Sequence, residues 1–383
     1  MFRAGSFFDL AATLLLACMI WGCTEDCPTR ECPAAEGDSP IMLQPDGSGD
    51  FSMIQAALDS AEVGSTIELA DGVYKGAGNR DLDFRGKTLT LRSSSGDPSC
   101  CIIDCEGDST AHHRGFCFRS GESSACLVEG IGVTGGYAGG ESIEWPDWGG
   151  AVSCTDESSP TFRNCVFARN YCTYVGGAIA TSGSSHPAFI DCEFVGNRCG
   201  MWGGAAYCDA GAPEFLSCVF SENTALEAGG ILCDIFSAVS IRYCVFLHNQ
   251  ARLGAAISCC RSAPLIDHCT LCGNSGETGA IYTYIGGSAQ LLNTIIAYSD
   301  SAAAIHCDHD DPIYLSRCNL FGNEGGDWTE PFLDQQERPG NLSCDPCFCD
   351  RESGNLRLRI ESPCSPDSTE SGGLVGALPV GCW

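Results

Sequence analysis

Two aspartates occupy equivalent positions in successive segments of similar sequence. Asp209 and Asp234 each directly follow a cysteine. If the two segments are neighbouring parallel strands, the carboxylates lie about one strand spacing apart, ~4.8 Å. Such a pair could raise one pKa, bind a cation such as Ca²⁺, or serve as acid and nucleophile of a retaining glycosidase. The alternative is two solvated acids on an acidic surface.

A second acidic group follows a cysteine further along the chain. Asp308 and Asp310 belong to the run Asp-His-Asp-Asp at 308–311. This run is the weaker calcium candidate because it lacks the regular ligand spacing of an EF-hand loop. Calcium is the one cofactor that the sequence suggests, and neither acidic group requires it.

Aromatic residues gather at one kind of corner. Trp148 and Trp202 each precede a Gly-Gly pair, Tyr174 lies alongside the intervening pair, and Trp145 belongs to an insertion over 137–148. Flat aromatic side chains at exposed corners near acids can stack on sugar rings or form protein-binding hot spots. The alternative is that these rings merely seal the loop. The sequence contains neither a Gly-x-Ser-x-Gly elbow nor a glycine-rich phosphate loop.

These residues belong to a repeat. Gly-Gly-Ala plus an apolar residue, or a close variant, returns every 24 to 27 residues, and its last position is Val152, Ile179, Ala206, Ile231, Ile257, Ile281 and Ile305. Twelve or thirteen residues later, six of the seven units carry a cysteine: Cys165, Cys192, Cys218, Cys244, Cys269 and Cys318. Five residues after that position, an asparagine recurs in six units: Asn170, Asn197, Asn223, Asn249, Asn274 and Asn323.

The spacing predicts strands that stack on themselves. An apolar residue lies two positions after each cysteine column position, so both side chains face the same way, into the core. One strand cannot bury that face alone, but a stack of like strands can. We therefore predict an all-β chain, a single-stranded right-handed parallel β-helix. A short helix near 54–61 should cap its N-terminal end, and the asparagines should form ladders at the corners.

The cysteine columns have a second consequence. Stacked Cβ atoms about one strand spacing apart exceed the usual disulfide range, so we expect buried thiols. Cysteines outside the columns are the disulfide candidates: Cys172 with Cys199 at matching corners, and Cys364 with Cys382 near the end.

The net charge limits the classes of molecule that the protein can bind. The 383 residues carry 20 basic and 49 acidic side chains, a net charge of −29. Such a surface repels nucleic-acid phosphates and anionic lipids, so no nucleic acid is expected and the membrane is reached only through a lipid anchor. We expect a monomer whose ligand is a glycan or a surface protein.

The N-terminus has the features of an export signal. Arg3 precedes a short apolar run, too short to cross a bilayer. Cys23, or Cys18, is the residue expected to be lipidated, with a plain secretory signal as the alternative. The predicted organisation is a signal peptide (1–22), a linker (23–40), an N-terminal cap with first strands (41–84), the β-helix (85–345) and a Cys-rich C-terminal cap (346–383). The protein is expected at the cell surface or outer membrane as a lipoprotein, or secreted.

Two families share these motifs. The stretch from Gly49-Asp50-Phe51 to Ile54-Gln-Ala-Ala-Leu58 resembles the entry of the pectin-lyase-like superfamily. The repeats over about 85–345 resemble those of polymorphic outer-membrane proteins, with Gly-Gly-Ala-Val at 149–152 and Phe-Ala-Arg-Asn at 167–170. The resemblance implies a right-handed parallel β-helix and suggests adhesion.

Enzymes of this superfamily cleave acidic polysaccharides, but their motifs are missing here. A polygalacturonase-like site needs Asn-Thr-Asp, and Asn293-Thr294 is followed by Ile295. We find no group of calcium-binding acids with an arginine base, as a pectate-lyase-like site requires. We therefore favour a surface-exposed binding or adhesion protein over an enzyme. The alternatives are a lyase or glycoside hydrolase acting on acidic polysaccharide, and a structural envelope spacer.

Overall fold

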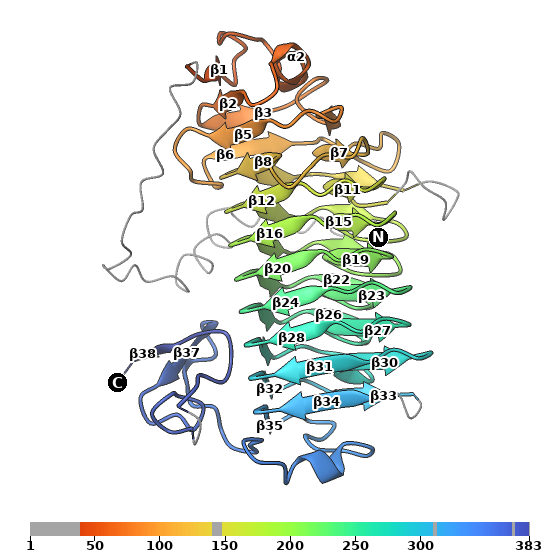
Figure 1. The fold of residues 1–383 in the computed structure, drawn as a ribbon, viewed down its shortest axis with the longest axis vertical. Helices are drawn as coiled ribbons and strands as arrows, with labels where there is room; N and C mark the ends of the chain where they lie inside the picture. Colours follow the sequence, from red (N-terminus) through yellow and green to blue (C-terminus); the bar gives the residue numbers. More distant parts are fainter. Residues whose placement is uncertain (1–38, 140–147, 309–311, 370–371, 383) are drawn as a thin grey trace, which may run out of the picture.

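Short strands build almost the whole molecule, because the repeat gives each coil several brief apolar segments that one strand alone cannot bury. The computed structural model describes residues 39–139, 148–308, 312–369 and 372–382. Strands from successive coils pair in parallel and form long sheets that run along one axis (Figure 1). The predicted parallel β-helix with a short helix near its N-terminal end is confirmed.

Four parallel sheets make up the solenoid. The nine-stranded sheet contains β4 (Leu82–Asp83), β7 (Phe116–Phe118), β11 (Val152–Cys154), β15 (Ile179–Thr181), β19 (Ala206–Asp209), β23 (Ile231–Asp234), β27 (Ile257–Cys260), β30 (Gly279–Tyr284) and β33 (Ala303–Cys307). The five-stranded sheet contains β10 (Tyr137–Ala138), β14 (Tyr171–Cys172), β18 (Arg198–Cys199), β22 (Thr224–Glu227) and β26 (Gln250–Leu253).

The other two sheets run almost the full length of the stack. The eleven-stranded sheet contains β1 (Ile41–Leu43), β2 (Thr66–Leu69), β5 (Thr90–Ser93), β8 (Leu127–Glu129), β12 (Thr161–Arg163), β16 (Ala188–Ile190), β20 (Glu214–Leu216), β24 (Ser240–Arg242), β28 (Leu265–Asp267), β31 (Ala289–Leu292) and β34 (Ile313–Ser316). The ten-stranded sheet contains β3 (Gly72–Tyr74), β6 (Cys101–Asp104), β9 (Gly132–Thr134), β13 (Val166–Ala168), β17 (Glu193–Val195), β21 (Val219–Ser221), β25 (Val245–Leu247), β29 (Thr270–Cys272), β32 (Ile295–Ala297) and β35 (Asn319–Phe321).

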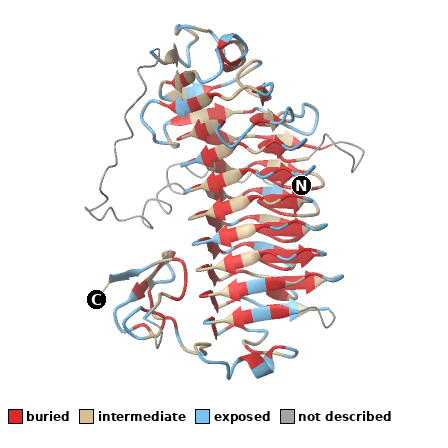
Figure 2. Cartoon of the chain, viewed as in Figure 1, coloured by how far each residue is buried: buried red, intermediate tan, exposed pale blue. Residues whose placement is uncertain are grey.

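Like side chains stack on like side chains inside the solenoid. Phe194 lies between Phe167 and Phe220, with ring centroids 5.2 and 4.7 Å apart and nearly parallel planes. Offset stacking of this kind is a favoured arrangement for aromatic pairs. Successive side chains of a strand point to opposite faces, so on many strands buried residues alternate with more exposed ones, as Figure 2 shows by colour.

The recurring asparagines form a buried ladder along the axis. The Asn223 Oδ1 atom accepts hydrogen bonds from the backbone N–H and the Nδ2 atom of Asn197, at 2.9 and 3.0 Å. Its own Nδ2 atom donates to the Phe194 carbonyl and to Asn249 Oδ1, at 2.8 and 2.9 Å. Each rung thus satisfies polar groups of the coil before and the coil after, which a buried corner requires.

The cysteine columns face the same interior. The column residues Cys165, Cys192, Cys218, Cys244, Cys269 and Cys318 are buried thiols. Each sulfur donates to a backbone carbonyl; the Cys218 Sγ atom lies 3.3 Å from the Phe189 oxygen. These thiols fill the core as small hydrophobes, which is the packing role of free cysteine.

The Gly-Gly corners need glycine for two different reasons. Gly176 has a φ of +69°, in the left-handed region that residues with a Cβ rarely adopt. At Gly177 an added Cβ atom would clash with the backbone oxygen of Gly204 on the next coil. Most coils therefore have glycine at these two positions, although Ala228 adopts the same positive φ, 57°, at one corner.

A short helix closes the N-terminal end. Helix α2 (Ile54–Ser60) buries Ile54, Ala57 and Leu58, the face expected from the sequence, and they join the main core. No helix among the described residues is long and apolar enough to cross a membrane. Cys18 and Cys23 lie outside the described residues, so their lipidation stays a prediction.

The opposite end is covered by a segment that the sequence did not single out. After β35 the chain crosses the last coil, where Trp328 and Phe332 pack into the main core. The short 3-10 helix η1 (Leu333–Gln335) follows. The Gln335 amide accepts from Leu315 N–H at 3.0 Å and donates to the Ile313 carbonyl at 2.8 Å. It thereby satisfies backbone groups of the outermost strand, β34, which would otherwise be an open edge.

The Cys-rich C-terminal segment is therefore not an end cap, contrary to our prediction. Its strands β36 (Phe348–Asp350), β37 (Asn355–Arg359) and β38 (Val380–Cys382) lie beside the stack (Figure 1). The segment covers apolar side chains on the outer face of the ten-stranded sheet. The resulting second core contains Val219, Val245, Leu247, Cys272, Ile295, Ala297, Phe348, Leu356, Leu358, Cys364, Val375 and Ala377. Outward apolar residues on β21 to β32 need this cover, which is the physical reason for the side position.

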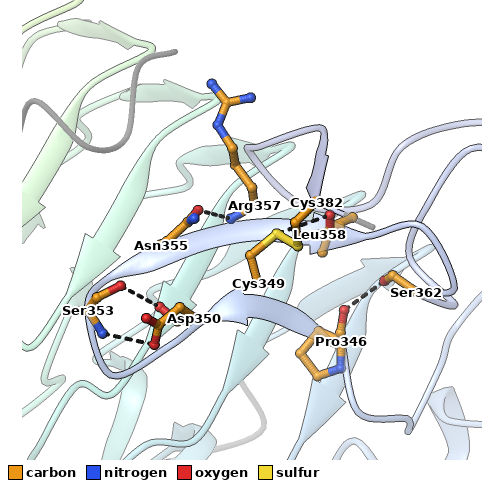
Figure 3. The surroundings of a disulfide bond; sticks show 9 residues. All are labelled: Pro346, Cys349, Asp350, Ser353, Asn355, Arg357, Leu358, Ser362 and Cys382. Carbon is orange, nitrogen blue, oxygen red and sulfur yellow. Dashed lines mark hydrogen bonds between the residues drawn. A yellow bond between two sulfur atoms is a disulfide. The ribbon is translucent and has the colours of Figure 1, made fainter.

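Both predicted disulfides are wrong. Cys382 is bonded to Cys349, with Cα atoms 6.0 Å apart, on strands of the same small sheet (Figure 3). Cys364 is buried between this segment and the stack, and its sulfur accepts a hydrogen bond from Asn319 Nδ2 at 3.2 Å.

The corner pair keeps its thiols. Cys172 and Cys199 are paired in register on β14 and β18 but are not joined. Neighbouring positions of a parallel ladder hold their Cβ atoms about one strand spacing apart, beyond the usual disulfide range. The same strand spacing therefore keeps the corner pair as thiols, as it does the inner columns.

Candidate functional site, an acid–aromatic face

The outer face of the nine-stranded sheet carries the polar residues that alternate with its core positions. Tyr207 aligns with Leu232, and Asp209 with Asp234, across β19 and β23. Further along the stack the same rows continue through β27, β30 and β33 to Ser258, Cys260, Tyr282, Tyr284 and His306. Because the strands alternate, every residue of these two rows points away from the core.

The two aspartates are adjacent, as their spacing predicted. Asp209 and Asp234 are direct partners in the parallel ladder. The Tyr207 hydroxyl donates to Asp234 Oδ2 at 3.0 Å, and the Ile235 N–H donates to Oδ1 at 2.8 Å. Burial, followed by the charge of Asp234, raises the pKa of Asp209 to about 6. The Asp209 Oδ1 atom is buried and has no hydrogen-bond partner among the described residues.

The predicted aromatic residues lie on the same face. The Trp148 ring meets the Tyr207 ring edge-on, with centroids 5.6 Å apart. Trp148, Tyr174 and Trp202 pack against a small buried cluster that contains Tyr207 and Leu232. The structure therefore joins the aromatic corner to the aspartate pair through Tyr207, which touches both. Trp145 lies outside the described residues.

A third carboxylate belongs to this face and was missed from the sequence. Glu227 ends β22 and pairs with Trp202 of the preceding coil. Its side chain is 6% exposed, and its Oε1 atom has no hydrogen-bond partner among the described residues. Burial, with a smaller contribution from Asp234, raises the pKa of Glu227 to about 7, although Tyr284 and Ser258 act in the opposite direction.

The sequence did contain a signal for Glu227. The residue before each glycine corner is Trp148, Val175, Trp202, Glu227 and then Leu253, so one carboxylate interrupts an apolar column. The predicted site residues were the acids that follow the cysteine column, which Glu227 does not. An acid in a half-buried apolar column is unusual enough to mark a site.

The far end of the face is a network around Asp308. The Tyr282 hydroxyl donates to Asp308 Oδ2, and His306 Nε2 lies 3.3 Å from Asp308 Oδ1. The rings of Tyr282 and Tyr284 stack with centroids 5.0 Å apart. We call the whole surface the acid–aromatic face, made of Trp148, Tyr174, Trp202, Tyr207, Asp209, Glu227, Asp234, Ser258, Tyr282, Tyr284, His306 and Asp308.

The calcium prediction gains no support from this geometry. Within the described part of the chain, no group of three or more His, Cys, Asp or Glu side chains is arranged to hold a metal ion. Asp310 lies outside the described residues, so its role at the Asp308 group stays a prediction. Asp209 and Asp234 alone supply too few ligands for Ca²⁺, which takes six to eight oxygens.

The raised pKa of Glu227 predicts a measurable pH dependence of folding. The group has a higher pKa when folded (about 7) than its ordinary value of 4.5, so the folded state holds the proton more tightly. Below about pH 4.5 the carboxyl is protonated in both the folded and the unfolded state, so its burial causes no loss of stability. As the pH rises through 7 the folded state must also lose the proton, and the buried charge then destabilises it. We expect Glu227→Gln to be more stable than the wild type at pH 8, by about 1–3 kcal/mol, with the difference vanishing near pH 4.5.

Urea unfolding at several pH values measures this effect. Glu222→Gln makes the same change at an exposed position and should leave the pH profile unchanged. A Glu227→Gln profile parallel to that of the wild type would show that this carboxyl keeps its ordinary pKa.

The repeat architecture agrees with a known family. Residues 91–296, more than half of the chain, match the family model described as a right handed beta helix region. The chain belongs to this right-handed β-helix family. No curated protein matches the β-helix chain.

Solved structures similar to this β-helix protein share little sequence with it. A pectate lyase, Pel9A, has a TM-score of 0.46 at 14% identity and covers 90% of this chain and 98% of its own. The pectin methylesterase from carrot has a TM-score of 0.42 at 11% identity, covering 74% and 90%. The deglycosylated pectin methylesterase from Aspergillus niger has a TM-score of 0.40 at 14% identity, covering 73% and 91%. Likeness at this level carries no argument about activity.

Proposed function

We propose that this β-helix protein binds a carbohydrate chain through the acid–aromatic face. The observation that carries the proposal is the double contact of Tyr207, whose ring meets Trp148 and whose hydroxyl bonds to Asp234. Sugar rings present both apolar faces and hydroxyl groups, so a ligand of this class needs flat aromatic surface beside hydrogen-bond acceptors. Binding sites combine these features in the same way, with a few polar groups fixing the orientation.

The shape of the surface supports a polymer. Coils stack at about the strand spacing of ~4.8 Å, so residues on successive coils form rows along the axis. Trp202 and Glu227 are neighbours in one such row, and Asp209 and Asp234 are neighbours in another. Parallel rows of this kind offer repeated contacts to a chain of repeated sugar units.

Removal of a tryptophan should weaken binding strongly. We expect Trp202→Ala and Trp148→Ala each to reduce glycan affinity at least tenfold, which corresponds to about 1.4 kcal/mol of lost stacking. Calorimetry after a glycan-array screen measures this. Tyr314→Ala, which removes a half-exposed aromatic side chain from the eleven-stranded sheet, is the matched control and should bind normally. Folded wild type that binds no glycan, or tryptophan variants with unchanged affinity, would refute the proposal.

Cleavage of the bound chain is the second candidate. Glu227, whose pKa is raised to about 7, lies near Asp234, and a carboxylic acid with a raised pKa beside a second carboxyl group is typical of glycosidases. Glu227 would protonate the leaving glycosidic oxygen while Asp234 attacks the anomeric carbon, and water would then hydrolyse the glycosyl ester on Asp234 as Glu227 takes back a proton. Incubation of the protein with each glycan that it binds, followed by measurement of new reducing ends, tests this candidate. Reducing ends that appear with the wild type and not with Glu227→Gln support cleavage, and no new reducing ends from any bound glycan rule it out.

We also propose display at the cell surface, where glycan binding would serve adhesion. This rests on the predicted export signal at 1–22 and the predicted linker at 23–40, not on the described coils. Membrane fractionation with a Cys23→Ser variant checks the anchor: loss of the protein from the membrane fraction supports lipidation, and unchanged partition contradicts it.

A further inference from the structure

The acid–aromatic face is electrostatically one-sided. Strands β19, β23, β27, β30 and β33, all described in full, contain neither lysine nor arginine. The face carries four carboxylates, Asp209, Glu227, Asp234 and Asp308, and its single histidine, His306, is held by Asp308. The nearest cations are Arg114, whose guanidinium donates to the Trp148 carbonyl, and Arg261, which follows β27, so along the strands themselves an anionic sugar such as a uronate would meet mainly like charges.

Several acceptors on the face also lack donors. The Glu227 Oε1 and Asp209 Oδ1 atoms are buried and have no hydrogen-bond partner among the described residues. The fully buried Ser258 hydroxyl also has no hydrogen-bond partner among the described residues, although it lies close enough to Glu227 to lower the pKa of that carboxyl. An ionised carboxylate only accepts hydrogen bonds, and a buried acceptor without a donor destabilises the fold. A ligand that supplies N–H donors would recover that free energy.

The position of Glu227 indicates where such a donor would lie. Glu227 follows Trp202 at the same corner position, one coil along the axis, and its buried side chain lies close to Tyr284. A sugar ring stacked on Trp202 would direct a substituent of the ring or of its neighbour toward Glu227. An ammonium group has three donors and a positive charge, so its bonds to carboxylates are stronger than those of a hydroxyl. It also interacts favourably with the faces of nearby aromatic rings.

We infer that the ligand of the acid–aromatic face is a cationic glycan, a polymer of sugars with free amino groups, held by Glu227, Asp209 and Asp234 while Trp202 stacks on the ring. This inference rests on the proposed glycan binding and specifies its substrate class. Uronate polymers, which are negatively charged, are excluded by the same charges that attract the amino sugar.

The affinities for three oligosaccharides of equal length distinguish the amino-sugar inference from the general proposal of glycan binding. We expect glucosamine oligomers at pH 7, where Asp209 is largely ionised and the bound ammonium group favours the ionised form of Glu227, to bind at least tenfold more tightly than N-acetylglucosamine oligomers, and galacturonate oligomers not to bind. Added salt should weaken glucosamine binding because the interaction is charge-assisted. Equal affinity for the charged and acetylated forms, or preferred binding of galacturonate, overturns the inference and leaves glycan binding intact. Absence of binding to any of the three, and to an array of neutral glycans, overturns both.

Substitutions of the acidic residues test whether they cause the preference for the charged oligomer. Glu227→Gln and Asp234→Asn should each reduce the preference for the charged form at least fivefold while retaining binding of the acetylated form. Glu222→Gln, exposed on another side of the solenoid, should keep the full preference. A lysine oligopeptide is included as a second source of ammonium groups: if it binds as tightly as the glucosamine oligomer and with the same sensitivity to Glu227→Gln, the amino-sugar assignment is wrong. An unchanged preference in both face variants also rejects it.

Discussion

Phe194→Ala is expected to destabilise the protein by about 3–5 kcal/mol, one of the largest effects of any single substitution in the stack. Phe194 is fully buried and touches four other rings, including its stacked neighbours Phe167 and Phe220. Alanine would leave a cavity that close packing on both sides prevents from collapsing. Urea unfolding followed by circular dichroism measures the loss as a lower midpoint.

The chain offers a matched control for this substitution. Phe236 is 80% exposed, so Phe236→Ala removes the same ring without opening a cavity and should change stability by less than about 0.5 kcal/mol. A loss below about 1 kcal/mol for Phe194→Ala would mean that the column is not packed as the ring distances imply.

Asn223→Asp should be at least as damaging at neutral pH, although it alters only one atom of the side chain. The Nδ2 atom of Asn223 donates to the Phe194 carbonyl and to Asn249 Oδ1, so an aspartate oxygen there would face two acceptors. A buried carboxylate in that position is desolvated and repelled, which raises its folded pKa. We expect a loss of more than about 3 kcal/mol at pH 7.

The pH dependence separates this mechanism from a general packing defect. Because the folded pKa lies above the unfolded value of about 3.9, the protonated form is favoured on folding and the loss should shrink as the pH falls toward 4. Gln250→Glu makes the same amide-to-acid change at the next residue after the ladder position Asn249, where the side chain is exposed, and should be nearly neutral at every pH. A loss from Asn223→Asp that stays constant between pH 4 and 8 would contradict the buried-charge explanation.

The sequence predicted the coils because each column repeats with nearly constant spacing. The inward cysteines and phenylalanines, the asparagine corners and the pairing of Asp209 with Asp234 all follow from one register. In a parallel stack, residues one repeat apart in sequence must lie one strand spacing apart in space.

The acid–aromatic face could be predicted only in part from the sequence. Its aspartates and tryptophans were named separately, because they lie several residues apart on the repeat and nothing in the spacing relates a corner to a strand end. Tyr207 connects them, and it is an outward residue that the column analysis left out. The burial that raises the pKa of Glu227 arises from side chains of other coils.

The repeat spacing was thus sufficient to predict the solenoid, its interior and the residues that share a row, because a repeat converts sequence distance into spatial distance. The positions of the segments outside the repeat depend on packing between residues far apart in the chain. The C-terminal segment covers the side of the ten-stranded sheet, and its disulfide joins Cys349 to Cys382, because outward apolar side chains far away in sequence required cover. The grouping of Glu227, Tyr207 and Trp148 into one face likewise depends on contacts between coils and across a corner, which no spacing along the chain specifies.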